Sequence, residues 1–427
     1  MLDTRTIKRF TVPFRSTGVS SAGSPPSWRQ RAFTPNYMQA RDACGPVRGE
    51  RSRTFQRGNT MVRLSLVLGC LLCLALYLPG IAAESTTWEE MTLPAGVENK
   101  ALYGVCFLPD GKHGWIVGAQ GLCLASSDGG VTWEKRETGS GATLRDVRFN
   151  NATQGWAVGE GDPKGPPPRG HIILSASRNS ATLLITTDGG KTWQNHWVPT
   201  NFELWSVETS AAPQIQIGPS GGEAHLDGDS LRCTDGKGWS SERTFRALFD
   251  IRAQDAQRWI AVGSPVDVGF FPAPTSELFT RKKCRALFSK DGGKTWMPAK
   301  GTEAMKGKCL RGLTVKKDAP ALAVGDGGAI MLSTDAGETW TSVASSATGS
   351  LKRVAYAHGE GKLVVAVGSK GTLLGSSDEG KTWDKAWSVD AKQNLFGLSA
   401  AGAFFVAVTK EGKVYRASLE NLAKTGK

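Results

Sequence analysis

The pattern of apolar and polar residues after residue 84 predicts short strands throughout. Seven segments alternate apolar with small or polar residues, which is typical of half-buried strands. In most copies a second apolar segment follows that ends in glycine, such as Gly114-Trp115-Ile116-Val117-Gly118, and suits a strand packed on both faces. The seven first segments are Leu102-Tyr103-Gly104-Val105, Leu144-Arg145-Asp146-Val147, Leu204-Trp205-Ser206-Val207, Phe245-Arg246-Ala247-Leu248, Leu310-Arg311-Gly312-Leu313, Leu351-Lys352-Arg353-Val354 and Leu395-Phe396-Gly397-Leu398.

A short turn motif recurs between the third and fourth strand of six of the seven copies. An Asp is followed by glycine, and the motif closes on Thr-Trp, as in Ser127-Asp128-Gly129-Gly130-Val131-Thr132-Trp133. One copy, Thr234-Asp235-Gly236-Lys237-Gly238-Trp239, is degenerate and lacks the Thr. An Asp in such a turn accepts hydrogen bonds from the following backbone amides, and glycine supplies a positive φ without steric cost. We therefore assign these Asp residues a structural role, as hairpin turns. The six positions are Asp128, Asp188, Asp235, Asp291, Asp335 and Asp378.

The spacing of these boxes predicts the architecture. Consecutive Asp positions lie 43 to 60 residues apart, and the shorter spacings match a four-stranded propeller blade. The seventh copy stops without a box, while Thr86-Thr87-Trp88 reproduces the end of a box at the start of the array. We therefore predict an all-β, seven-bladed β-propeller over residues 84 to 427, with a ring closed by the N-terminal strand. Closure would protect the edges of a linear array.

The residues before the array have a different composition. Residues 1 to 60 are rich in Arg and Ser and lack an apolar period, so we expect them to be a disordered leader, either a mis-called start or a transit segment. Residues 61 to 83 combine a charged start, a short apolar run and small residues before Glu84, which predicts a secretory signal peptide. The run is too short to favour a membrane span. Gly69-Cys70 resembles a lipoprotein signal, but the apolar run continues past it.

Charge and cysteine content narrow the possible functions. The formal net charge is +13, but residues 1 to 60 hold eleven Lys and Arg against three acids, so the basicity belongs mainly to the leader and we predict no nucleic-acid partner. Five cysteines remain after residue 83, which is an odd number without a C-x-x-C pair, so we predict neither a disulfide framework nor zinc. We expect them to be small apolar residues within strands. They are Cys106, Cys123, Cys233, Cys284 and Cys309.

One position of the first strands is a candidate binding site. The first strand of a propeller blade lines the central channel, so equivalent positions should form a ring near one channel mouth. Basic and aromatic residues share this position and favour an anionic or aromatic partner. The alternative interpretation is that these long side chains are solvated strand ends. The predicted ring consists of Tyr103, Arg145, Trp205, Arg246, Arg311, Lys352 and Phe396.

No catalytic, metal or cofactor site is predicted. The box Asp residues occupy the same turn in every copy, whereas a catalytic pair is unique. The histidines share no ligand spacing, no Ser-His-Asp arrangement is evident, and no glycine-rich segment leads into a phosphate-binding helix.

The S-x-D-x-G-x-T-W pattern of the box, combined with Gly-Trp-x-Val-Gly second strands and an export signal, resembles the photosystem II stability and assembly factor family of BNR, or Asp-box, propellers. The resemblance implies a non-enzymatic, exported scaffold that binds membrane-protein assembly intermediates through an arginine-rich patch. It places that patch on Arg145, Arg246, Arg311 and Lys352. The compartment implied is the periplasm or the exterior, or the thylakoid lumen in a photosynthetic organism.

Two other functions share the Asp box. A sialidase-like glycoside hydrolase would use Arg145, Arg246 and Arg311 for a substrate carboxylate, with Tyr103 and Asp146 as nominal catalytic groups, although a Glu partner is missing. A secreted lectin-like or adhesion propeller is the third possibility.

We expect a monomer that binds protein, with specificity supplied by two long insertions at residues 160 to 180 and 264 to 283.

Overall fold

The computed structural model describes residues 87–163, 181–196, 204–209, 215–219, 229–233, 239–243, 248–263, 286–302, 305, 308–359 and 361–425. All of them belong to the compact unit Ile81–Lys427. The predicted leader and signal peptide, the second insertion and nearly all of the first lie outside the described residues, as do Asp235, Arg246 and Cys284.

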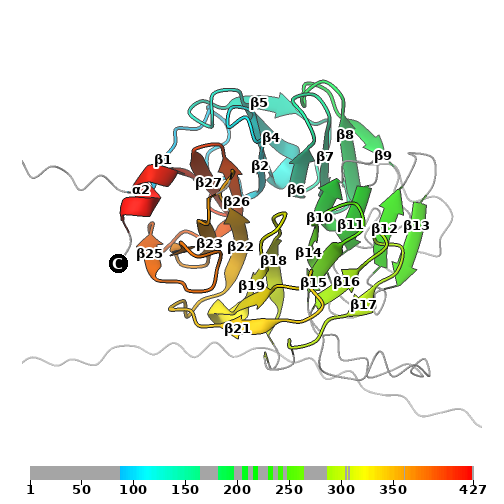
Figure 1. Ribbon diagram of the computed structural model, residues 1–427. Helices are drawn as coiled ribbons and strands as arrows, with labels where there is room; N and C mark the ends of the chain where they lie inside the picture. Colours follow the sequence, from blue (N-terminus) through cyan, green and yellow to red (C-terminus); the bar gives the residue numbers. More distant parts are fainter. Residues whose placement is uncertain are drawn as a thin grey trace, which may run out of the picture. The chain divides into compact units, whose positions relative to one another are not determined.

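The described residues form seven four-stranded antiparallel sheets around a common centre (Figure 1). Six sheets are built from consecutive strands, so each is a meander. This confirms the predicted all-β propeller fold. The first three of these sheets contain β2 (Leu102–Phe107), β3 (Gly114–Gly118), β4 (Leu122–Ser126) and β5 (Glu134–Glu137); β6 (Leu144–Phe149), β7 (Gly155–Gly159), β8 (Thr182–Thr186) and β9 (Gln194–His196); and β10 (Leu204–Thr209), β11 (Ile215–Pro219), β12 (Asp229–Cys233) and β13 (Trp239–Arg243).

The following three sheets repeat the same order. They contain β14 (Leu248–Ala253), β15 (Trp259–Gly263), β16 (Ala286–Ser289) and β17 (Met297–Pro298); β18 (Leu310–Thr314), β19 (Ala321–Gly325), β20 (Ile330–Ser333) and β21 (Thr341–Val343); and β22 (Leu351–Tyr356), β23 (Val364–Gly368), β24 (Thr372–Ser376) and β25 (Lys385–Ser388). Two short 3₁₀ turns, η1 (Ala119–Gly121) and η4 (Asp326–Gly328), connect second to third strands.

The remaining sheet joins the two ends of the array. It contains β26 (Leu395–Ala401), β27 (Phe404–Thr409) and β28 (Val414–Ser418), and its fourth strand is β1 (Glu89–Glu90), where Glu89 is paired with Arg416 and Glu90 with Tyr415. The helix α2 (Leu419–Lys424) follows β28 and is capped by the Ser418 hydroxyl, which accepts a hydrogen bond from the Asn421 amide. The outer strand of this last sheet, β1, therefore comes from the start of the array.

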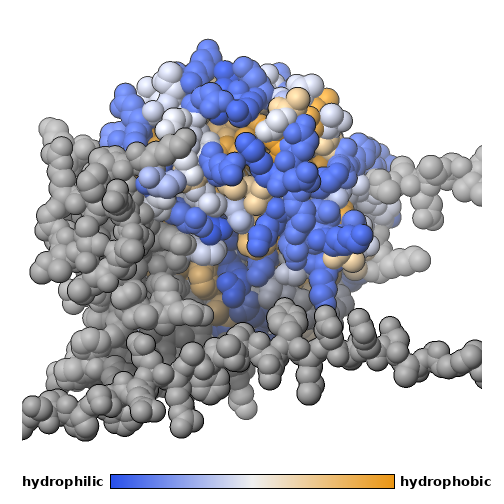
Figure 2. All heavy atoms as spheres, turned by 180° about the vertical axis from the view of Figure 1, so that it is seen from behind, coloured by the Kyte–Doolittle hydropathy of each residue, from blue (hydrophilic) through white to orange (hydrophobic). Residues whose placement is uncertain are grey.

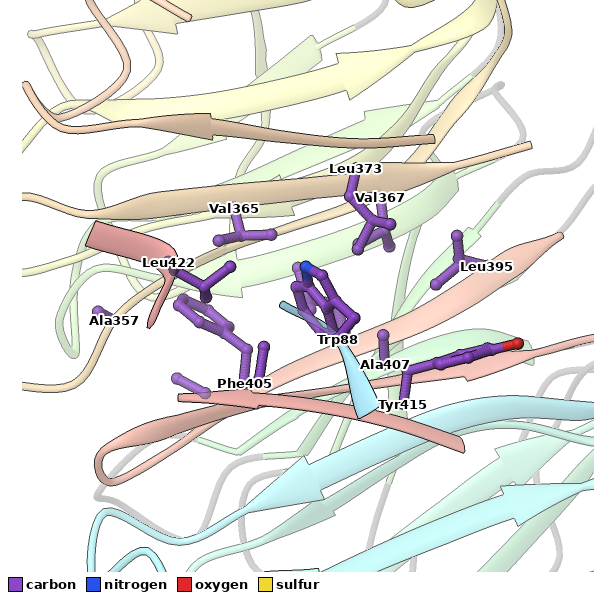
Figure 3. Packing of buried hydrophobic residues seen from close by; sticks show 13 residues of the cluster. Trp88, Ala357, Val365, Val367, Leu373, Leu395, Phe405, Ala407, Tyr415 and Leu422 are labelled. Carbon is purple, nitrogen blue, oxygen red and sulfur yellow. The ribbon is translucent and has the colours of Figure 1, made fainter. Parts of the chain in front are cut away.

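The apolar core lies between neighbouring sheets. One cluster joins Val365 and Val367 of β23 to Phe405 and Ala407 of β27, and the indole of Trp88, only 4% exposed, inserts among them (Figure 3). Trp88 immediately precedes β1, so the N-terminal segment contributes to the core as well as to the sheet. Similar clusters lie between the other pairs of sheets, such as the one that joins Val406 to residues of β2 and β4.

The Asp boxes have one geometry wherever the structure describes them. In the second box, the Thr186 hydroxyl lies 2.8 Å from Oδ1 of Asp188, and the amide and hydroxyl of Thr192 donate to the two oxygens of the same carboxylate at 2.9 and 2.6 Å. These bonds from Thr192 lower the pKa of Asp188 to about 2. The boxes of Asp128, Asp291, Asp335 and Asp378 repeat this network.

The outer surface of the described part is mostly hydrophilic. Figure 2 shows hydrophilic residues over much of the face opposite to that of Figure 1, with smaller hydrophobic areas between them. Among the described residues, only Val131 and Met297 are exposed large hydrophobic residues. A search of the described part of the chain finds no helix with the length and apolar character needed to cross a membrane.

Candidate functional site

The predicted ring position has an identifiable backbone cause. In every sheet, the pairing between the first and second strands skips one residue just after the leucine that starts the first strand; for example, Leu102 pairs with Gly118 and Gly104 pairs with Val117. The skipped residue is a β-bulge, which re-aims its side chain away from the regular pleat. The seven bulge residues are Tyr103, Arg145, Trp205, Phe249, Arg311, Lys352 and Phe396. We call them the belt.

Belt side chains contact their neighbours along most of the ring. The guanidinium of Arg145 lies 4.5 Å from the ring centroid of Tyr103 and 4.7 Å from that of Trp205. The Trp205 ring meets Phe249 edge to face at 5.4 Å, and Arg311 lies 5.0 Å from Phe249. Lys352 lies 5.6 Å from the Phe396 ring, and Phe396 meets Tyr103 edge to face at 5.5 Å. The belt is thus a sequence of cation–π and edge-to-face contacts in which all seven side chains are half-buried.

Both belt arginines are fixed by an acid that follows the second strand of the same sheet. Arg311 donates from Nε and Nη2 to the two oxygens of Asp326 at 2.6 and 3.2 Å, and Asp326 also accepts from the Ser350 hydroxyl at 2.9 Å. Burial opposes ionisation, but the bonds from Arg311 bring the pKa of Asp326 to about 2. Arg145 pairs through Nη2 with one carboxylate oxygen of Glu160, the first residue of the first insertion. These acids hold the guanidinium planes against their aromatic neighbours.

Lys352 differs from the two arginines. Among the described residues it has no ion pair, and its contact is the face of Phe396. Burial, followed by the nearby Arg311, lowers the pKa of Lys352. Lys352 is therefore the belt cation whose charge is least compensated within the described part of the chain.

One sequence assignment to the ring is wrong in register. The fourth first strand was predicted to begin at Phe245, which placed Arg246 in the ring, but β14 begins at Leu248 and its bulge residue is Phe249. Arg246 itself lies outside the described residues. The six other first strands all start with Leu, so the leucine at position 248 was the signal that would have set the register. The predicted positions of Tyr103, Arg145, Trp205, Arg311, Lys352 and Phe396 agree with the bulges.

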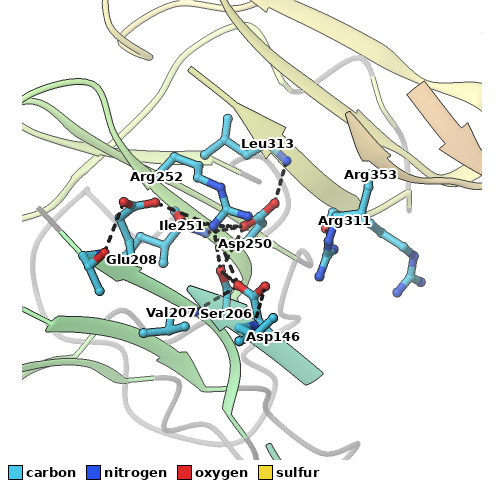
Figure 4. A network of polar contacts seen from close by, with 12 residues as sticks. Asp146, Ser206, Val207, Glu208, Asp250, Ile251, Arg252, Arg311, Leu313 and Arg353 are labelled. Carbon is cyan, nitrogen blue, oxygen red and sulfur yellow. Dashed lines mark hydrogen bonds and ion pairs between the residues drawn. The ribbon is translucent and has the colours of Figure 1, made fainter. Parts of the chain in front are cut away.

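A second polar cluster lies inside the channel, and sequence reasoning missed it. Asp250, which is fully buried, accepts hydrogen bonds from the Leu313 amide at 2.8 Å and the Ser206 hydroxyl at 2.9 Å, and pairs with Nη1 of Arg252 at 2.7 Å (Figure 4). Asp146 accepts from the amide of Val207 at 3.2 Å and lies 3.1 Å from the Ser206 hydroxyl. These contacts tie together the first strands of four sheets: β6, β10, β14 and β18.

The charges of this cluster are tuned by burial and by each other. Burial alone would raise the pKa of Asp146, but the guanidinium groups of Arg148 and Arg252 hold it below its usual range. Burial raises the pKa of Glu208, whose Oε2 is 3.8 Å from Arg252. The sequence signal was the alternation Asp146-x-Arg148, Ser206-x-Glu208 and Asp250-x-Arg252, which places both residues of each pair on the channel face of a first strand.

The other predicted residues have local roles where the structure describes them. The box carboxylates of Asp128, Asp188, Asp291, Asp335 and Asp378 accept hydrogen bonds within their own turns, in keeping with their assigned structural role, and Asp235 lies outside the described residues. Cys106 and Cys123 are buried, and burial raises the pKa of Cys123 to about 12. No group of acidic, His and Cys side chains that could hold a metal ion occurs within the described ranges.

Comparison with known families supports the resemblance inferred from the motifs. Residues 81–164 match the family model "Photosynthesis system II assembly factor YCF48", and residues 184–195 match the BNR/Asp-box repeat. A photosystem II stability/assembly factor HCF136 of Guillardia theta is 40% identical over 55 residues, 13% of this chain and 13% of that protein. The photosystem II assembly lipoprotein Ycf48 of Prochlorococcus marinus is 27% identical over 174 residues, 32% of this chain. These alignments span at most about half of the relatives' length, namely 49% in the second case.

Solved structures share the fold over most of the described unit. The structure entitled "YCF48 bound to D1 peptide" superposes with a TM-score of 0.55 and 19% identity, covering 78% of this chain and 96% of that one. An inactive virginiamycin B lyase of Staphylococcus aureus superposes equally broadly, with a TM-score of 0.58, 12% identity and coverage of 78% and 99%. Since a binding protein and an enzyme are matched alike, this likeness establishes the propeller fold and leaves function to the residues.

Proposed function

We propose that this chain, a BNR propeller similar to the photosystem II assembly factors, is a non-enzymatic binding protein that holds a polypeptide partner against the belt. The observation that carries the proposal is the belt itself, in which three cations and four aromatic rings contact one another at the bulge position of the seven sheets. Aromatic and arginine side chains are the residue types that dominate protein-binding hot spots.

The charge of the belt defines the partner chemistry. Arg145 and Arg311 are paired with acids of the same chain, whereas Lys352 has no acidic partner among the residues described. A partner segment with a carboxylate near an aromatic or aliphatic group would pair with Lys352 and stack on Phe396. The solved structure of the YCF48 protein contains a D1 peptide, which supports a polypeptide, here an assembly intermediate of a membrane protein, as the class of partner.

The finer architecture belongs to the same proposal. We infer a monomeric, seven-bladed ring over residues 84 to 427, closed by the N-terminal strand. Support comes from the number of four-stranded sheets among the described residues, the pairing of β1 with β28, and contacts between β2 and β26. The composition of residues 61 to 83 supports a signal peptide and export to the periplasm, to the exterior, or to the lumen of a thylakoid.

The insertions would add specificity to the belt. The first begins at Glu160, which pairs with Arg145, so this loop starts at the belt. We propose that residues 160 to 180 and 264 to 283 contact the partner beside the ring. Long loops on a rigid scaffold commonly carry such selectivity.

The alternative enzyme has less support in the residues. A sialidase-like site needs three convergent arginines, but the belt position at which Arg246 was expected is occupied by Phe249. The other two arginines, Arg145 and Arg311, already pair with Glu160 and Asp326. The ring of Tyr103 contacts Arg145 and Phe396, and its hydroxyl makes no hydrogen bond to a glutamate among the described residues. No specific observation favours the lectin-like alternative.

The test is affinity capture from solubilised membranes of the source organism with the wild-type chain and with Lys352→Glu. The proposal expects a membrane protein to be retained by the wild type and lost in the variant. Lys381→Glu, at an exposed box lysine, is the matched control and should retain the protein. Capture that is equal in all three proteins contradicts the belt as binding site, and hydrolysis of a fluorogenic sialoside by the wild type contradicts the non-enzymatic function.

A further inference from the structure

The channel contains a cavity that is distinct in chemistry from the belt. Its volume is about 430 Å³, within the range of about 300–1,000 Å³ that small-molecule pockets occupy. Tyr103 of the belt contributes to its wall, and from there the cavity follows the first strands to Lys316 and His358 at their other ends. The cavity is therefore an elongated space along the inner strands.

Three arginines and three acids lie in or beside the wall of this cavity. Arg148, Glu208, Arg252 and Arg353 line it together with Asp146, and Asp250 pairs with Arg252 (Figure 4). The two aspartates are satisfied within the protein, because backbone amides of Val147, Val207, Ile251 and Leu313 donate to them. Their charges thus serve the inner strands and neutralise Arg252.

Arg148 and Arg353 have unused hydrogen-bonding capacity. The Nε of Arg148 is buried and has no hydrogen-bond partner among the described residues. Arg353 donates from Nη1 only to the backbone carbonyls of Arg311 and Lys352, at 3.1 and 3.2 Å, and no ion pair of its own is found in the described part. A buried guanidinium donor without a partner is costly unless an acceptor satisfies it.

The charge balance defines the missing acceptor. Four cations, Arg148, Arg252, Arg353 and Lys316, line the cavity and carry +4, whereas the three acids Asp146, Glu208 and Asp250 carry −3. One negative charge completes the set. A carboxylate matches the planar fork of a guanidinium in shape as well as charge, whereas a doubly charged phosphate would exceed the balance.

We propose that this channel cavity binds a small monocarboxylate, held between Arg148 and Arg353. The site stands apart from the proposed function, because it lies inside the channel and its cations belong to residues that the belt does not use. The volume accommodates a free molecule, with Tyr356 and Leu313 providing an apolar wall beside the charged one.

The test uses the full chain with benzoate as probe and benzamide, its neutral analogue, as control. Saturation-transfer NMR titrations should give benzoate binding with a Kd in the millimolar range or lower and none for benzamide. Arg148→Gln and Arg353→Gln should each weaken benzoate binding roughly tenfold or more, the effect of losing one charged hydrogen bond. Arg258→Gln, which removes an exposed arginine of the β14–β15 turn, should bind as the wild type does.

The two variants are on different sheets, so Arg353→Gln on β22 tests the cavity even if Arg148→Gln on β6 fails to fold. The proposal is overturned if the wild type does not bind benzoate, if benzamide binds equally well, or if a folded glutamine variant binds benzoate unchanged.

A blocked peptide with a single glutamate forms the second arm of the experiment. Binding of benzoate, with or without the peptide, supports the site, and binding of the peptide alone overturns the assignment to a small molecule.

Discussion

The ring of Tyr103 on β2 meets the ring of Phe396 on β26 edge to face, with centroids 5.5 Å apart. These residues are separated by most of the repeat array, and each is the bulge residue of its own sheet. A hydrogen bond of 3.0 Å from the Phe107 amide to the Ser399 hydroxyl joins the same two strands further along the channel. The inner strands of the first and last copies are thus in direct contact.

This contact should be measurable as a coupling free energy. In a double-mutant cycle with Tyr103→Leu and Phe396→Leu, we expect the loss of stability in the double variant to be smaller than the sum of the two single losses by about 0.5–1.5 kcal/mol. Urea denaturation of the four proteins measures it. Trp205→Leu combined with Phe396→Leu is the control, since these two rings share no contact, and should be additive within about 0.5 kcal/mol. Additivity in the Tyr103 cycle would contradict the contact.

The sequence predicted the propeller and most of the belt because both follow from repeated local patterns. The box geometry is set within seven residues, and the start of each first strand is marked by leucine, so six of the belt positions were correct. The exception, Arg246 in place of Phe249, arose where the repeat unit is least regular and the neighbouring box is degenerate. The predicted ring position of this sheet therefore lies three residues before the observed one.

The channel cluster could not be predicted in the same way. Asp250 bonds to Leu313, Ser206 and Arg252, which belong to three different sheets, and these contacts depend on how the inner strands converge. Repeated motifs do not mark this cluster, because it is asymmetric: the residues that correspond to Asp146, Ser206 and Asp250 in the other four copies are Gly104, Gly312, Arg353 and Gly397. The informative signal for the cluster was therefore a difference in residue type between equivalent positions of the seven copies.

Replacing Trp88 should test the contribution of the N-terminal segment to the core. The indole is buried against Phe405 and Val365, so Trp88→Ala should lower the free energy of unfolding by about 3–5 kcal/mol, and Trp88→Phe by less. Glu89→Ala, at an exposed position of β1, should change it by less than about 0.5 kcal/mol. Urea denaturation measures all three, and a Trp88→Ala effect as small as that of Glu89→Ala would show that the segment is not part of the folded core.

The box carboxylates should make the protein sensitive to acid. Hydrogen bonds from Thr192 lower the pKa of Asp188 to about 2, and at Asp291 those from Thr295 do the same although burial opposes them. Because the folded pKa lies below the ordinary value of 3.8, this stabilisation is present above about pH 4 and is lost as the pH falls towards 2. A double variant with Asp188→Asn and Asp291→Asn cannot titrate at these two positions. The stability difference between wild type and variant, measured by urea denaturation from about pH 5 to about pH 2, should therefore shrink; a constant difference would refute the assignment.

Asp250 and Glu208 give a sharper comparison, because the loss of charge should destabilise the protein to different extents at two acids of one buried cluster. Asp250 pairs with Arg252 at 2.7 Å, so Asp250→Asn leaves that guanidinium uncompensated and should cost about 3 kcal/mol of stability. Burial raises the pKa of Glu208, whose neutral form Gln resembles, and the Thr209 amide can still donate to the amide oxygen. Oε2 of Glu208 lies 3.8 Å from Nη1 of Arg252, farther than the 2.7 Å of the Asp250 pair, so Glu208→Gln should lower the free energy of unfolding by less than Asp250→Asn does. Equal losses in the two variants would contradict this difference between the two acids.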